Sequence, residues 1–280
     1  MSQITVVTTF HADGMRKYGQ RFIDSFIQKV DKRITLLVYA EECAPYISNN
    51  QQVTLLNANI ELPKLIAFKE KWKNVPKANG DVSQDPVRSL RKDAGKGFKW
   101  DAVRFANKTY AVFDACNRSK DWVVWMDADT FVHSEWSHKE FNKLLPNDKW
   151  LTYVGRGKGS QTWPECGFYG MNLNHPVCVQ FLKEFERYYE DADNGIFELE
   201  EWHDSYVFGH ILNNLKFVNS NVLDYSAEMY LKEAKTGGGG HPLINTVLGK
   251  WIDHMKGDRK NIGKSLPKDI MVNRTEDYWR

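Results

Sequence analysis

The sequence lacks the features that mark several large classes of protein. Its 280 residues include only four cysteines, and no two of them have Cys-x-x-Cys spacing. A disulfide scaffold or a zinc ribbon needs cysteines at closer spacing, so we expect free thiols at Cys43, Cys116, Cys166 and Cys178. No apolar run reaches the roughly 18 residues that a membrane helix needs, so we expect no integral membrane segment.

The chain also lacks a large excess of either positive or negative charge. The chain has 38 basic and 36 acidic residues, a formal net charge of +2. Because nucleic-acid binding usually needs a strong basic excess, we expect no nucleic-acid partner. A modest basic cluster from Arg88 to Lys99 is expected to be a solvated loop. The N-terminus enters an apolar run without the pattern of a signal peptide, which predicts a cytoplasmic protein.

The hydrophobic periodicity predicts an α/β fold. A β-branched run at Ile4–Thr9, a helical pattern at Tyr18–Val30 and a second apolar run at Ile34–Tyr39 form a strand–helix–strand unit. Such units build parallel sheets. No Gly-x-Gly-x-x-Gly follows the first strand, which argues against a dinucleotide-binding Rossmann site.

Further elements follow from the same patterns. Strands are expected at 53–56, 123–126 and 150–154, with a strand-like run at 165–172. Helices are expected at 62–72, 100–116, 135–145 and 177–189, and another begins near 201. Residues 74–99 form a long loop. The glycine-rich stretch 155–161 can cradle an anion but lacks Walker spacing.

The most informative stretch is an apolar strand, Val123–Met126, that ends in Asp127-Ala128-Asp129. Two carboxylates one residue apart at a strand end repel each other and are costly to desolvate. A divalent cation removes both problems, and Mg²⁺ and Mn²⁺ favour carboxylate oxygen. A polar turn is the alternative. We predict a site for Mn²⁺ or Mg²⁺ that uses Asp127 and Asp129.

This pattern resembles the Asp-x-Asp motif of GT-A glycosyltransferases, whose carboxylates bind a metal that holds a nucleotide-sugar diphosphate. Phosphatases of the haloacid dehalogenase type carry Asp-x-Asp-x-Thr on their first strand. Here Phe131 stands at the Thr position and the motif lies in mid-chain, so the phosphatase is disfavoured. The resemblance implies a GT-A fold, Rossmann-like with a mostly parallel sheet. It also implies one domain over 1–280, with a nucleotide-binding half (1–130), a sugar and acceptor half (131–257) and a tail (258–280).

Two later segments resemble retaining members of these enzymes. Trp202-His203-Asp204-Ser205 is similar to the Trp-His-Asp-Glu-Ser segment of family 6 transferases, in which the Asp contacts the donor sugar and the Glu is the proposed nucleophile. The resemblance places Asp204 and His203 at the donor. Ser205 replaces the Glu, which leaves Glu165 and Glu201 as possible catalytic substitutes; helix capping by Asp204 is the alternative.

His254-x-Lys256-Gly257 resembles a C-terminal element of family 8 transferases, in which a His is the third metal ligand and a Lys meets the diphosphate. The resemblance implies that His254 completes the metal site and that Lys256 and Gly257 contact the donor. A structural histidine is the alternative. Imidazole is a competent Mn²⁺ ligand beside carboxylates, and lysine is a natural phosphate partner.

The remaining candidate donor contacts come from four segments. Thr8, Thr9 and Phe10 end the first strand, where GT-A enzymes commonly contact base and ribose. Gly167, in a run similar to the small-residue strand of these enzymes, permits close backbone approach. Ala128 lies between the two carboxylates. On the helix at 100–116, Arg104 and Lys108 share a face; either Arg104 points at the donor or the two face solvent.

Together these features predict a metal-dependent, retaining glycosyltransferase that uses a nucleotide-sugar donor, with a UDP-sugar favoured, and a glycan or other acceptor. A sugar-nucleotide nucleotidyltransferase is one alternative, although its glycine- and lysine-rich first loop is missing between Thr8 and Gly14. A non-catalytic nucleotide- or carbohydrate-binding protein is another. The loop at 236–241 is expected to close over the donor, and the tail from 258 is expected to order late.

Overall fold

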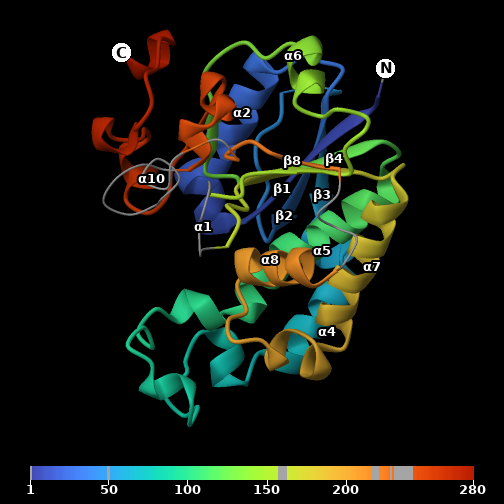
Figure 1. Ribbon diagram of the computed structural model, residues 1–280, viewed down its shortest axis with the longest axis vertical. Helices are drawn as coiled ribbons and strands as arrows, with labels where there is room; N and C mark the ends of the chain where they lie inside the picture. The colour runs from blue at the N-terminus through green and yellow to red at the C-terminus, as the bar shows by residue number, and fades with distance from the viewer. Residues whose placement is uncertain (1, 49–50, 157–162, 216–220, 228, 230–241) are drawn as a thin grey trace.

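A seven-stranded sheet forms the centre of the computed structural model, which describes residues 2–48, 51–156, 163–215, 221–227, 229 and 242–280 (Figure 1). The strand order is β3-β2-β1-β4-β7-β6-β8. The strands are β1 (Ile4–His11), β2 (Thr35–Glu41), β3 (Val53–Asn57), β4 (Trp122–Met126), β6 (Leu151–Tyr153), β7 (Phe168–Asn172) and β8 (Val222–Asp224).

Only β7 runs against the other strands of this sheet. The pairs β1–β2, β1–β4, β2–β3 and β6–β8 are parallel, whereas β7 is antiparallel to both β4 and β6. The predicted α/β class with a mostly parallel sheet is therefore confirmed. The reversal brings the start of β7 beside the end of β4, because Met126 pairs with Phe168.

Helices cover both faces of the sheet (Figure 1). One face packs against α4 (Pro63–Trp72), α5 (Ala102–Arg118), α7 (Pro176–Glu190) and α8 (Asp204–Asn214), and the other against α2 (Gln20–Lys29) and α6 (His138–Lys143). Successive residues of a strand point to opposite faces, so Val123 and Trp125 join the first cluster and Val124 and Met126 the second. This two-sided cover explains why β4 is apolar at every position.

A small ribbon outside the main sheet positions the candidate site. Strands β5 (Thr130–Val132) and β9 (Ile252–His254) pair antiparallel, with Thr130 opposite His254. The Trp136 and Trp251 rings stack behind this ribbon, with centroids 5.1 Å apart and planes 4° from parallel. Packing of this kind fixes the ribbon against the second core cluster.

Several sequence predictions need correction. The helix expected over 135–145 is only α6, because Trp136 forms a β-bridge with Val30 and a capping box at Ser137 and Glu140 starts the helix at His138. The helix expected from Trp100 begins at Ala102, capped by Asp101, and continues to Arg118. The predicted loop at 74–99 contains short 3₁₀ turns, η2 (Pro76–Asn79), η3 (Arg88–Leu90) and η4 (Gly97–Trp100).

The remaining elements are short. They are α1 (Ala12–Gly14), the π-helix η1 (Met15–Gly19), α3 (Ala58–Glu61), η5 (Ala192–Asn194), η6 (Ile196–Glu198), η7 (Leu243–Asn245), η8 (Val247–Lys250), α10 (Arg259–Ile262), η9 (Pro267–Asp269) and η10 (Asp277–Trp279). The tail from 258 is packed, because Ser265 and Asp269 are buried. The glycine-rich loop at 236–241 and residues 157–161 lie outside the described residues.

The cysteines Cys43, Cys116, Cys166 and Cys178 are all free thiols, as expected. Within the described ranges, every helix is too short or too polar to cross a bilayer.

Candidate functional site

Three predicted metal ligands converge at the carboxyl end of β4. One ligand atom from each of Asp127, Asp129 and His254 lies within 4.8 Å of the others. Asp127 and Asp129 follow β4 directly. His254 ends β9, and the pairing of β9 with β5 places it opposite Thr130, next to Asp129. Ligands of open α/β sheets bind beyond the carboxyl ends of strands, and this cluster lies there.

Gly167 makes room for the histidine. Its carbonyl accepts a hydrogen bond from the Asp127 N–H at 2.9 Å. A Cβ atom at this position would lie 2.4 Å from His254 Cε1, too close for two carbon atoms. The glycine predicted to permit close approach therefore admits the imidazole of His254.

The three side chains are strongly coupled by charge. His254 Nε2 lies 3.1 Å from Asp129 Oδ1 and 3.4 Å from Asp127 Oδ2. Burial opposes the protonated imidazole, but the two carboxylates outweigh burial and raise the pKa of His254 to about 9. Burial likewise opposes ionisation of Asp127 and Asp129, yet Lys108 and His254 hold the pKa of Asp127, and His254 that of Asp129, below the ordinary value. Both carboxylates are therefore ionised at neutral pH.

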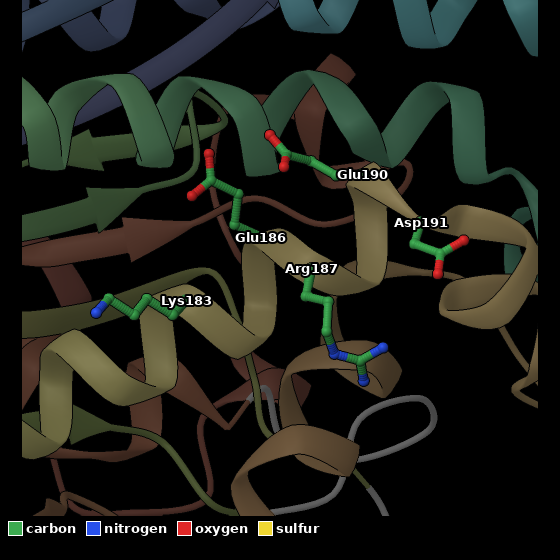
Figure 2. Close-up of a pocket in the computed structure, with 5 residues that line it drawn as sticks. All are labelled: Lys183, Glu186, Arg187, Glu190 and Asp191. Atoms are coloured by element: carbon green, nitrogen blue, oxygen red, sulfur yellow. The ribbon is translucent and has the colours of Figure 1, made fainter.

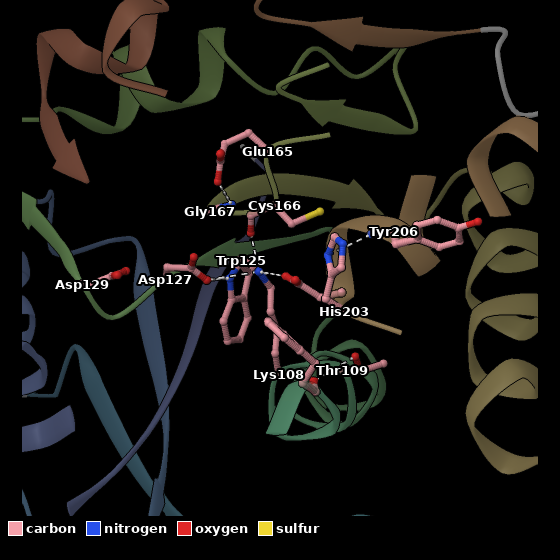
Figure 3. A network of polar contacts seen from close by, with 12 residues as sticks. Lys108, Thr109, Trp125, Asp127, Asp129, Glu165, Cys166, Gly167, His203 and Tyr206 are labelled. Carbon is pink, nitrogen blue, oxygen red and sulfur yellow. Dashed lines mark hydrogen bonds and ion pairs between the residues drawn. The ribbon is translucent and has the colours of Figure 1, made fainter. Parts of the chain in front are cut away.

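Lys108 overturns the solvent-facing alternative that the sequence left open for Arg104 and Lys108. It does not face solvent but lies buried beneath the site, where its Nζ is 3.1 Å from Asp127 Oδ1 and 2.7 Å from Asp204 Oδ2 (Figure 3). It also donates to the Cys166 carbonyl. Burial disfavours its charge, but the two carboxylates raise its pKa above the ordinary value. Lys108 therefore joins the β4 end to the start of α8.

The sequence contains a signal for this placement. Lys108 lies three, four and seven residues before Ala111, Val112 and Ala115, all of which are buried on the core side of α5. That spacing defines one helix face, so a lysine in it is a buried charge that needs partners.

A second lysine contacts the triad from the C-terminal region. Lys260, on α10, lies 2.9 Å from Asp129 Oδ2, and its Nζ is 4.9 Å from the Tyr18 ring. Tyr18 belongs to the π-helix η1. Sequence reasoning identified neither residue; π-helices are rare and occur often at functional sites, but nothing in the pattern predicted one here.

At the start of α8, Asp204 is linked to the metal triad, whereas His203 and Glu201 pair with each other. Asp204 is joined to Asp127 through Lys108. His203 caps the helix by accepting from the Tyr206 N–H, and its Nε2 lies 3.0 Å from Glu201. Glu201 also pairs with Lys99 at 2.5 Å and with Arg91 at 3.2 Å. Glu201 is thus held by the segment that precedes α5.

Glu165 pairs with Lys256 behind Gly167. Lys256 Nζ lies 2.5 Å from the Glu165 carboxylate, and Arg156 Nη2 lies 3.1 Å from it. Glu165 is almost fully buried. The lysine predicted to meet a diphosphate therefore neutralises a buried carboxylate, while Gly257 beside it has open space around its backbone.

The remaining candidates take different positions. Thr8 and Phe10 are buried, with Phe10 in the second core cluster, and Thr9 donates to the Tyr39 carbonyl at 2.7 Å. Ala128 is buried between the carboxylates. Arg104 is exposed in the first turn of α5 and is not buried with Lys108, although its charge acts on Tyr18.

A hollow of about 360 Å³ lies elsewhere, along α7. Its lining consists of charged side chains from that helix and its C-cap, namely Lys183, Glu186, Arg187, Glu190 and Asp191 (Figure 2). Lys64 pairs with Glu186 and Glu190 there. No residue of the Asp127, Asp129 and His254 triad lines it, and it lacks the apolar walls typical of ligand pockets.

The triad fits a divalent cation by two tests. Two ionised carboxylates and one imidazole are a competent donor set for such an ion. Gly167 leaves space beside the imidazole that any larger residue would fill. Without an ion, His254, Lys108 and Lys260 supply the countercharge.

No family model matches the chain, and no curated protein matches it. Among solved structures, the bifunctional glycosyltransferase WbbM in its apo form matches with a TM-score of 0.43 and 14% identity, covering 80% of this chain and 38% of that one. Mouse xyloside xylosyltransferase 1, also apo, matches with a TM-score of 0.43 and 8% identity, covering 76% and 82%. The chain thus spans well under half of WbbM.

Proposed function

We propose that this chain is a metal-dependent glycosyltransferase, which moves a hexose from a nucleotide-sugar, with a UDP-sugar favoured, to a glycan or other acceptor. The observation that carries the proposal is the convergence of Asp127, Asp129 and His254 at the carboxyl end of β4, bracketed by Lys108 and Lys260. Asp127, whose side chain is 28% exposed, and the neighbouring lysines suit a cation that is shared with phosphate oxygens.

Asp127, Asp129 and His254 would hold Mn²⁺ or Mg²⁺, which supplies a Lewis acid for the departing diphosphate. Lys260 contacts Asp129, so its ammonium lies where a phosphate carried by that cluster would need a positive partner. Lys256 is a second such cation, since more than a third of its side chain is exposed while it pairs with Glu165. Asp204, fixed by Lys108, orients the donor sugar.

The ion pairs around the two candidate nucleophiles favour a retaining reaction in which no carboxylate attacks the donor sugar. Both candidate nucleophiles are held by cations, Glu165 by Lys256 and Arg156 and Glu201 by Lys99 and Arg91. A carboxylate held in this way is a poor nucleophile, because its charge is already stabilised. We therefore propose attack on the face from which the diphosphate leaves, with a leaving phosphate oxygen accepting the acceptor proton.

The test is a thermal shift experiment with UDP, GDP, CDP and their sugars, each with Mn²⁺ or with EDTA. A metal-dependent rise in Tm with one nucleotide supports the donor site and identifies the base. Asp129→Asn should abolish that rise, whereas the control Glu135→Gln, at a largely exposed carboxylate, should preserve it.

Turnover distinguishes the reaction classes. Release of the nucleoside diphosphate from the nucleotide-sugar, by transfer or slow hydrolysis, supports a glycosyltransferase. Formation of a nucleotide-sugar from nucleoside triphosphate and sugar 1-phosphate would favour a nucleotidyltransferase. Binding without turnover on any acceptor would favour a non-catalytic protein, and the absence of any metal-dependent binding would overturn the proposal.

A further inference from the structure

The loop at residues 86–98, between α4 and α5, has its two arginine side chains, Arg88 and Arg91, turned toward the body of the protein. Arg88 Nη2 donates to the Leu199 carbonyl at 2.7 Å, and its guanidinium lies 4.7 Å from the Trp202 ring. Arg91 pairs with Glu201. The basic cluster expected to be solvated is therefore bound in part to the segment before α8, which fixes the loop to the body of the protein.

The apolar side chains of the same loop point outward. The exposed fraction is 70% for Val87, 84% for Leu90 and 49% for Phe98. Leu90 is the most exposed large apolar side chain that the structure describes. Figure 1 shows the segment between α4 and α5 projecting past α8, away from the sheet. An apolar group of this kind on a projecting, anchored loop marks an interaction surface.

The exposed charged side chains of the loop itself are positive, and the exposed Glu200 beside the loop lies 3.7 Å from Arg91. Lys92 and Lys96 are exposed on the same loop. Its one acidic residue, Asp93, is only 24% exposed and pairs with Arg91 and Lys99. The outward surface therefore combines apolar side chains with lysines.

We propose that the 86–98 loop docks this protein on an anionic lipid bilayer. Val87, Leu90 and Phe98 enter the interface between headgroups and acyl chains, and Lys92 and Lys96 contact lipid phosphates. The Phe98 ring also lies 5.9 Å from the His203 ring, so the docking surface adjoins the start of α8. This proposal does not depend on the transferase reaction.

A second copy of the chain fits the surface less well. In a two-fold interface the same patch faces itself, which would set Lys92 and Lys96 against their own copies. Three apolar side chains also expose far less than the roughly 800 Å² per partner that stable protein interfaces bury. Anionic lipid satisfies both the apolar and the basic groups.

The experiment is vesicle flotation with the full chain, using phosphatidylcholine vesicles and phosphatidylcholine vesicles that contain phosphatidylglycerol. We expect the full chain to float with the anionic vesicles and much less with the neutral ones. Val87→Ser/Leu90→Ser should lower the partition coefficient by about tenfold or more, because two apolar side chains no longer enter the bilayer. Lys92→Glu/Lys96→Glu should lower binding to the anionic vesicles by about tenfold or more.

The matched control is Ile60→Ser, at a residue that is 71% exposed on α3 and outside the loop. All these side chains are exposed, so the variants should fold, which the circular dichroism spectrum checks. Equal binding by the parent chain and the loop variants, or equal loss in Ile60→Ser, would overturn the proposal. So would the absence of flotation, or a dimer in sedimentation velocity that Leu90→Ser dissociates.

Discussion

At the scale of residues, the candidate site is a balance between buried carboxylates and the cations around them. Asp127 is held by Lys108 and His254, and Asp129 by His254 and Lys260. A charge taken out of water is costly unless it is paired, and removing one partner exposes that cost in full. Single substitutions here should therefore have large and separable effects.

Lys108→Met should destabilise the protein in EDTA. The substitution leaves the carboxylates of Asp127 and Asp204 facing each other without their shared cation, which should lower the free energy of unfolding by about 3 kcal/mol. Urea denaturation measures the change. The double variant Lys108→Met/Asp204→Asn removes one of the two charges and should regain part of the loss. A Lys108→Met protein as stable as the parent would show that the pairs contribute nothing.

Gly167→Ala should weaken metal binding. The new Cβ would lie 2.4 Å from His254 Cε1, and the imidazole is fully buried, so it must leave its position beside the carboxylates. Because His254 would no longer lie where it can bind the metal, Mn²⁺ affinity should fall by about tenfold or more, as measured by calorimetry.

Gly170→Ala is the matched control for this substitution. Its Cβ would meet Leu145 and Thr152 instead of a metal ligand, so it should lower stability but preserve Mn²⁺ affinity. Equal loss of affinity in both variants would mean that general destabilisation, not the contact with His254, explains the result.

At the scale of elements, the β5–β9 ribbon is held by the C-terminal tail. The His133 ring, just after β5, stacks on Tyr278 with centroids 4.1 Å apart and planes 3° from parallel. The Tyr278 hydroxyl donates to Asp253 in β9 at 2.7 Å, and Asp253 accepts two bonds from Ser265. The tail thus connects both strands that carry the ribbon.

This packing predicts a pH dependence of stability. Burial lowers the pKa of His133 from 6.5 to about 4, with Arg274 and Lys264 acting in the same direction. The folded state therefore disfavours the protonated ring. The stability linked to His133 is fully present above pH 6.5 and is lost progressively as the pH falls toward 4.

His133→Phe should remove this part of the pH dependence, because phenylalanine can stack on Tyr278 but cannot be protonated. Thermal unfolding between pH 7.5 and 4.5 measures the difference between the parent chain and the variant. Parallel curves for the two proteins would contradict the prediction.

At the scale of the whole molecule, the site connects distant parts of the chain. His254 follows Asp129 by 125 positions, and Lys108 reaches the site from a helix on the opposite side of β4 from α2. A ligand that binds only this folded arrangement must stabilise the entire fold.

Removal of metal should therefore lower global stability. At a Mn²⁺ concentration about 100 times Kd, the free energy of unfolding should exceed that in EDTA by about 2.7 kcal/mol. Urea denaturation should show this as a shifted midpoint with an unchanged slope, because the surface exposed on unfolding stays the same. Identical curves with Mn²⁺ and EDTA would exclude a metal at the triad.

The sequence by itself determined the elements whose signals are local. The apolar runs of β1, β2 and β4 and the helical stripes of α2, α4, α5 and α7 predicted the α/β class, because burial on one or two faces imposes the periodicity. Asp127, Asp129 and His254 were also identifiable from sequence, as a polar motif after a strand and as a resemblance. The division of the chain into nucleotide and acceptor halves stays a prediction.

Only the tertiary structure decided which charges meet. Glu165 pairs with Lys256 across 91 positions, and Lys260 reaches Asp129 across 131. Such pairs leave no periodic trace, because a salt bridge depends on the approach of two side chains in space and not on their spacing in the chain. The reversal of β7 and the β5–β9 ribbon are non-local for the same reason. They place the carboxylates, the imidazole and the lysines in one site.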